Sequence, residues 1–63
     1  MTTFEIVFIQ QNDLGRLYAI QKTVQHHDEI NRSIVYIASV RGEAGRIECK
    51  NKMPDYIAAQ NSK

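Results

Sequence analysis

The residues best suited to chemistry in this chain are four consecutive polar side chains, His26, His27, Asp28 and Glu29. Imidazole and carboxylate groups are ligands that Zn²⁺ accepts, and histidine titrates near neutral pH. A metal site needs ligands that converge on one point, whereas neighbouring residues of a helix diverge by about 100°. We therefore interpret this run as the polar start of a helix, and we expect no metal.

The candidate nucleophiles also lack the partners that catalysis needs. Cys49 shares the inward face of a predicted strand with Ile47, and a free cysteine in an inward position is usually a small buried hydrophobe. Ser33 and Ser39 lie in no pattern that resembles a nucleophile elbow. We expect no catalytic residues, no cofactor and no enzyme activity.

Length and composition indicate one small globular domain over residues 1–63. The ordered core should cover about residues 3–60, with fraying at Ser62 and Lys63. The chain is 43% hydrophobic and 24% charged, with a net charge of +1. A chain this short buries only about 60% of its unfolded surface, so its core is thin, which favours self-association or a partner.

The N-terminal residues and the single cysteine predict the cellular location. Residues 1–8 carry no positive charge and include Glu5 within the apolar run, which is unlike a signal peptide. The apolar runs are too short to span a membrane. We expect a protein of the cytoplasm, or of the host cytoplasm if a phage encodes it, without a membrane partner.

Two strands and a turn are predicted in the first part of the chain. Residues 4–10 are rich in β-branched and aromatic side chains on both faces, which suits a central strand. Residues 11–15 contain the turn formers Asn12, Asp13 and Gly15, and residues 16–24 form the next strand. The spacing predicts an antiparallel hairpin.

A helix is predicted over residues 28–42, and its start stays open between a cap at Thr23 and a cap at Asp28. Ile30, Ile34 and Ile37 fall on one stripe at helical spacing. Acids at the start and an arginine at the end match the helix dipole, and Gly42 suits the left-handed cap.

The remaining residues predict a third strand and a short second helix. Residues 46–51 alternate polar and apolar, and Pro54 is well placed at the first position of a helix over residues 54–60. The predicted fold is α+β: a small antiparallel three-stranded sheet in ββαβ order with one helix packed on it, plus the short C-terminal helix. In the alternative, residues 33–40 form a strand paired with residues 46–51, which gives an all-β meander.

Two binding surfaces are considered. Tyrosine and arginine are favoured anchors in protein interfaces, and the candidate partner-binding residues are Tyr18, Arg32, Tyr36 and Arg46. A basic sheet face with a nearby tyrosine would suit a nucleic acid, and its candidate residues are Arg16, Lys22, Arg46 and Lys50.

Three short segments carry a resemblance to a known family. They are Glu5-Ile6-Val7-Phe8-Ile9, His27-Asp28-Glu29-Ile30 and Ile47-Glu48-Cys49. In the order of strand, polar entry and acid–cysteine pair, the chain resembles the Dmd-like antitoxins, small host-takeover proteins of T-even bacteriophages. The resemblance implies an inhibitor without chemistry of its own that occludes a host RNA-cleaving toxin.

The sequence therefore predicts a small non-catalytic regulator that binds another protein, expected to be a host bacterial protein, or a second copy as a homodimer. The alternative is a small regulatory domain that binds nucleic acid through the basic sheet face.

Overall fold

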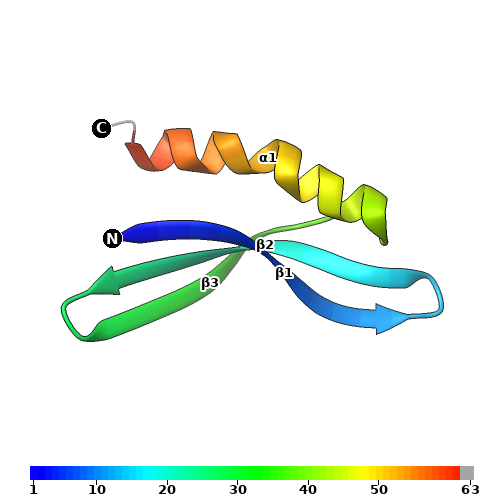
Figure 1. Cartoon of the computed structure of the whole chain (residues 1–63), viewed down its shortest axis with the longest axis horizontal. Helices are drawn as coiled ribbons and strands as arrows, with labels where there is room; N and C mark the ends of the chain where they lie inside the picture. The colour runs from blue at the N-terminus through cyan, green and yellow to red at the C-terminus, as the bar shows by residue number, and fades with distance from the viewer. Residues whose placement is uncertain (62–63) are drawn as a thin grey trace.

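Three strands are followed by one helix in the computed structural model, which describes residues 1–61 (Figure 1). The elements are β1 (Thr2–Asn12), β2 (Gly15–His26), β3 (Glu29–Ile37) and α1 (Glu43–Asn61). The sheet is antiparallel in the order β1-β2-β3. The predicted α+β class and three-stranded sheet are confirmed, but the element order is βββα instead of ββαβ. The fraying predicted for Ser62 and Lys63 lies outside the described residues.

The first hairpin follows the sequence prediction closely. The side-chain oxygen Oδ1 of Asn12 accepts a hydrogen bond from the Leu14 amide at 2.8 Å, and Gly15 has a φ of 118°, which favours glycine. β1 is nevertheless an edge strand and not a central one. One of its apolar faces lies under α1, and the other, which includes Val7, belongs to the exposed side of the sheet.

The helix predicted over residues 28–42 is wrong, because this segment forms a second hairpin. His26 pairs with Glu29 across a two-residue loop, in which His27 takes a φ of 56°. A positive φ at the first of the two loop residues, and not at the second, is typical of a type II′ turn. Asp28 is therefore a turn residue and not a helix start.

A β-bulge explains why β3 imitates a helix in its sequence. The pairing with β2 shifts between Ile20 and Gln21, so that Val35 is an extra residue between Ile34 and Tyr36. In a regular strand, Ile34 and Ile37 would point to opposite faces. The bulge returns Ile37 to the face that Ile30 and Ile34 occupy, and it produces the i, i+4, i+7 spacing of a helix.

A single continuous helix replaces both the strand predicted over residues 46–51 and the short helix predicted to begin at Pro54. α1 begins at Glu43 and contains Pro54 in its interior, where the ring removes one backbone donor (Figure 1). There is no second C-terminal helix among residues 1–61. The all-β alternative is also wrong: residues 33–37 are extended, but they pair with β2.

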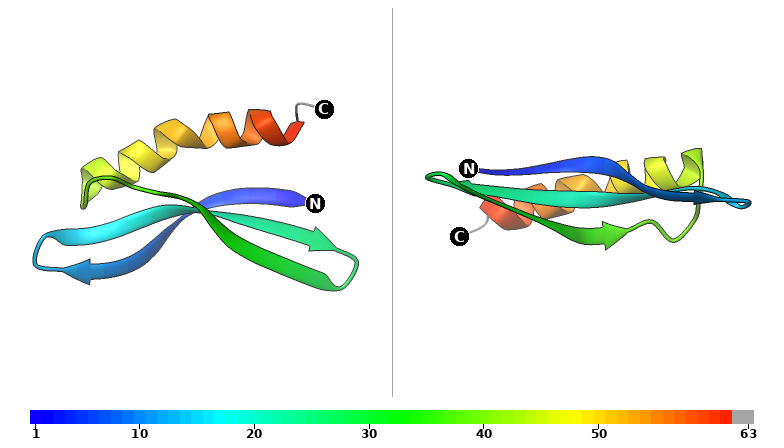
Figure 2. Two further views of the ribbon diagram at one scale, coloured as in Figure 1. Left: turned by 180° about the vertical axis from the view of Figure 1, so that it is seen from behind. Right: turned by 90° about the horizontal axis from the view of Figure 1, so that it is seen from below.

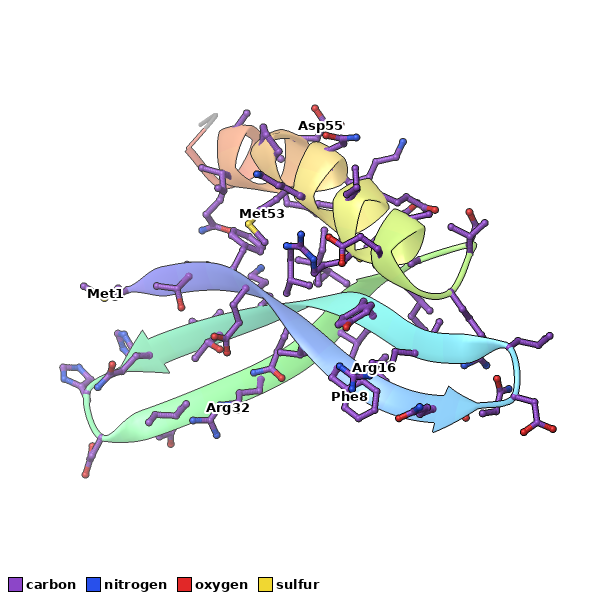
Figure 3. All side chains as sticks on the ribbon, turned by 45° about the vertical axis from the view of Figure 1, so that its right-hand side comes forward. Met1, Phe8, Arg16, Arg32, Met53 and Asp55 are labelled. Carbon is purple, nitrogen blue, oxygen red and sulfur yellow. The ribbon has the colours of Figure 1, made fainter. Side chains whose placement is uncertain are left out.

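The core lies between α1 and one face of the sheet. Ile20 and Cys49 are fully buried in contact with Ala38. Partly buried side chains surround them, namely Phe4, Ile6, Tyr18, Val35, Tyr36, Met53 and Tyr56. Figure 3 shows Met53 directed from α1 toward the sheet and Asp55 directed away from it. The prediction that Cys49 points inward is confirmed, although it does so from a helix.

The connector between β3 and α1 brings the helix close to the sheet. The amides of Ala38 and Gly42 donate to the carbonyls of Tyr18 and Arg16 at 3.0 and 2.8 Å. A β-carbon on Gly45 would lie 2.2 Å from the Val40 carbonyl oxygen. Glycine is therefore required at this position by the close approach of two backbones.

Candidate functional site

The face of the sheet opposite α1 is the largest feature with functional potential. Within residues 1–61, no element packs on it, and Figure 2 (right) views the molecule from this side, with the strands in front of the helix. We call it the open face. Its apolar side chains are Val7, Leu17, Ala19, Ile30, Ile34 and Ile37.

Strand pairing places all of these side chains except Ile30 in adjoining rows. Val7, Ala19 and Ile37 are cross-strand neighbours in one row. Ile34 lies in the next row beside Gln21, and Leu17 follows Ala19 along β2. Ala19 is fully buried between its larger neighbours although α1 is on the other side of the sheet. The open face therefore has a continuous apolar centre.

The three isoleucines of β3 remain half exposed. Their exposed fractions are 51% for Ile30, 45% for Ile34 and 54% for Ile37. The described chain exposes 4705 Å², whereas a monomeric protein of this mass exposes about 4,200 Å². The thin two-layer shape and the uncovered sheet face account for this excess of exposed area.

Two opposite charges border the apolar centre of the open face. Glu5 on β1 pairs with Gln21 of β2, and Arg32 on β3 pairs with Thr23 of β2. The two charged residues therefore lie in adjacent rows on opposite edge strands. Figure 3 shows Arg32 on the side of β3 away from the helix. The described open face therefore carries one acid and one base, with no net charge.

Both edges of the sheet are interrupted. β1 has an irregularity between Phe8 and Gln10, and β3 has its bulge at Val35. Bulges at edge strands hinder continuous pairing with a further strand. The open face is for this reason a better contact surface than either edge.

The predicted partner-binding residues do not gather on one surface. Arg32 lies on the open face, whereas Tyr18 and Tyr36 contact the core on the helix-covered side. Arg46 lies on α1, where its Nε donates to Glu43 Oε1 at 3.0 Å and its guanidinium forms an ion pair with the same carboxylate. This pairing raises the pKa of Arg46 and lowers that of Glu43.

The predicted nucleic-acid residues are divided between the sheet and the helix. Arg16 and Lys22 are six residues apart on the helix-covered face of β2. Figure 3 shows Arg16 beside Phe8. The Arg16 guanidinium carbon is 5.9 Å from the centre of the Phe8 ring. Arg46 and Lys50 are on α1, four residues apart. These four cations therefore do not form one basic sheet face.

The histidine and carboxylate run lies at the tip of the second hairpin. The His26 and His27 rings are 4.3 Å apart between centres, at an interplanar angle of 63°. Across residues 1–61, no group of three or more His, Cys, Asp or Glu side chains is arranged to hold a metal ion.

Hydrogen bonds to Glu48 connect α1 to β3 and to the connector that follows β3. Glu48 Oε2 accepts hydrogen bonds from the Tyr36 hydroxyl and from the Ser39 amide, and Oε1 accepts from the Ser39 hydroxyl. The Tyr36 hydrogen bond, followed by those from Ser39, lowers the pKa of Glu48, and the same bond to Glu48 raises the pKa of Tyr36 to about 12. Tyr36 is thereby kept protonated and Glu48 ionised, and in these states their hydrogen bond joins the sheet to α1.

The other candidate positions have little chemical potential. Burial raises the pKa of the Cys49 thiol, which disfavours the nucleophilic thiolate. An open depression of about 300 Å³ lies between the start of β1 and the end of α1. It is lined by Thr2, Thr3, Phe4, Ile57 and Gln60, and none of these side chains ionises.

Sequence reasoning missed the open face because it assigned β3 to a helix. Ile30, Arg32 and Ile34 alternate with Asn31 and Ser33, and this two-residue period was the signal for a strand with one apolar side. No helix within residues 1–61 is both long and apolar enough to cross a membrane. Comparisons with protein-family models, curated proteins and solved structures found no match to this chain.

Proposed function

We propose that this chain is a small non-catalytic protein-binding module that acts through the open face. The observation that carries the proposal is the exposure of three isoleucines on the uncovered face of β3, with Ile34 and Ile37 in adjoining rows and Ile30 beyond Arg32. Contiguous exposed apolar surface on a small protein usually marks a contact site. Regulation would follow from steric occlusion of the partner surface on which the open face lies.

The apolar centre supplies the driving force for association. Burying a whole isoleucine side chain contributes about 1.5–3 kcal/mol. Since each of the three is about half exposed, a partner would gain roughly 1 kcal/mol from each, or about 3 kcal/mol in total. Glu5 and Arg32 at the border would select the orientation, because charged groups confer specificity more than affinity.

The charge of the open face favours a protein over a nucleic acid. Binding to phosphates requires several cations without neighbouring acids. Arg32 is accompanied by Glu5 in the adjacent row, and three isoleucines occupy positions where phosphate contacts would need lysine or arginine. We therefore put forward a protein partner. A host bacterial protein, such as the toxin implied by the resemblance, stays a prediction.

A matched pair of variants tests the proposal. Ile34 on the open face and Ile47 on α1 are 45% and 46% exposed, so a glutamate replaces the same side chain in an equally exposed place. Tagged wild type, Ile34→Glu and Ile47→Glu would be used to capture proteins from a bacterial lysate. We expect one protein in stoichiometric amount with the wild type and Ile47→Glu, and its loss with Ile34→Glu.

Circular dichroism should first show that both variants keep the fold. Equal capture by the two variants would move the binding surface away from the open face. Capture of nothing by the wild type would remove the proposed function.

A further inference from the structure

We infer that the open face also takes a second copy of this chain, stacked face to face about a two-fold axis that runs parallel to β2. This inference rests on the proposed function, since it names an occupant for the same surface. It is carried by three features of the described residues: the charge pattern, the dimensions of the face and the interrupted edges.

The charge pattern of the open face is complementary to itself. A two-fold axis parallel to β2 places β1 of one copy over β3 of the other. Glu5 then lies over the row of Ile34 in the partner, one row from the partner's Arg32. Adjacent rows are about 7 Å apart and packed sheets about 10 Å apart, distances that glutamate and arginine side chains can bridge together. The symmetry produces this pair twice.

The same charges disfavour the other face-to-face arrangement. An in-plane axis perpendicular to the strands would place β1 over β1 and β3 over β3. Glu5 would then lie near its own copy, and so would Arg32, which brings like charges together. The pattern therefore selects the axis parallel to β2.

The dimensions of the face suit a weak but specific dimer. The molecule measures 41 × 24 × 11 Å, and Figure 1 shows that the long dimension runs between the two hairpin tips of the sheet. The sheet is three strands wide, about 14 Å, only where β3 pairs with residues 19–26 of β2, and two strands wide beyond, hence roughly 500 Å² per copy. Stable interfaces bury about 600–1,000 Å² per partner, so this contact lies below that range, as expected for a weak, reversible dimer.

Stacking would also bury the second face of the sheet, whereas a single copy has a core on only one face. Ile20, Ala38 and Cys49 form the buried cluster under α1, whereas Ile34 and Ile37 face outward. In the stacked arrangement the sheet becomes an inner layer, with a helix on each outer side. The bulges of β1 and β3 disfavour the competing edge-to-edge dimer.

Sedimentation equilibrium of the purified full chain tests the inference. Between about 1 and 300 µM we expect a reversible monomer–dimer equilibrium with a micromolar dissociation constant. Ile34→Glu should weaken the dimer at least about tenfold, and Ile47→Glu should leave it within about twofold, because only the first charge is desolvated in the interface.

Charge exchange tests the proposed axis. Glu5→Arg alone and Arg32→Glu alone should each weaken the dimer about tenfold, since each places like charges together. The double variant Glu5→Arg/Arg32→Glu restores opposite charges and should return the dissociation constant to within about threefold of the wild type. Failure of the double variant to recover would overturn the arrangement.

A chain that stays monomeric over the whole concentration range would refute the second copy as occupant. If the same chain still lost its lysate partner through Ile34→Glu, the proposed function would stand without the dimer. A dimer insensitive to Ile34→Glu would refute the inference, because the contact would then use another surface.

Discussion

Replacement of Gly45 by alanine should destabilise the protein, although the same change normally stabilises a helix. Alanine is favoured over glycine in a helix by about 1 kcal/mol. At Gly45 the added β-carbon would lie 2.2 Å from the Val40 carbonyl oxygen, whereas ordinary contact begins at 3.4 Å. The neighbouring atom belongs to the backbone, so a side-chain rotation cannot relieve the clash.

The expected loss follows from these opposing effects. Forcing extra atoms into a filled space costs about 1–3 kcal/mol, and the gain in helix propensity offsets part of it. We expect a net loss of about 1–2 kcal/mol, which lowers Tm by about 5–15 °C for a domain of this size. Thermal and urea unfolding followed by circular dichroism would measure both quantities.

Two controls isolate the clash. Asn51→Ala changes an exposed position of the same helix and should raise stability slightly. Ala38→Gly removes only the 3.3 Å contact with the Ala38 β-carbon, so it should not rescue Gly45→Ala. Stability of Gly45→Ala equal to or above that of the wild type would refute the close approach of connector and helix.

Three further predictions concern the polar contacts and the second hairpin. The pKa of Tyr36 is raised from 10.0 to about 12, so the stability that it contributes is complete below pH 10 and is lost as the pH rises toward 12; Tyr36→Phe should remove the latest component of the tyrosine absorbance titration. The pKa of Glu48 is lowered from 4.5, so its contribution is present above that pH and is lost as the pH falls through the depressed value; urea unfolding of Glu48→Gln should show less acid dependence. His27 has a φ of 56°, and His27→Gly should raise stability by about 0.5–1 kcal/mol; an unchanged Tm would show that the turn is not strained.

The first hairpin was predictable because its determinants are local. Asn12 and Gly15 set the turn, and the flanking strands have the β-branched and aromatic residues that strands favour. The buried state of Cys49 was also predictable, since it follows from residue type more than from secondary structure.

β3 was assigned wrongly because its bulge changes the period of the pattern after Ile34, although residues 30–34 alternate as a strand does. One extra residue at Val35 turns the two-residue repeat of a strand into the spacing of a helix. The pairing with β2 decides between the two, and this contact is distant along the chain.

α1 was not predicted because its local sequence disfavours a helix. Gly45, Asn51 and Pro54 disfavour helices, yet all three lie within it. Gly45 is required by the connector, and the packing of Cys49 and Tyr56 on the sheet outweighs the local preferences.

The open face depends on both of these elements being placed correctly. Once β3 is assigned to a helix, Ile30, Ile34 and Ile37 become its core stripe and the exposed apolar face is lost from the prediction. The proposed binding surface is thus a consequence of the third strand and not of a motif.

Methyl NMR of the isoleucines in a dilution series tests most directly whether the open face is where this chain meets another chain. Ile47 and Ile57 on α1 are exposed to a similar degree and serve as internal references. We expect concentration-dependent shifts at Ile30, Ile34 and Ile37, with the two references unchanged. Shifts at Ile47, or none at any isoleucine of β3, would contradict the stacking of two copies through the open face.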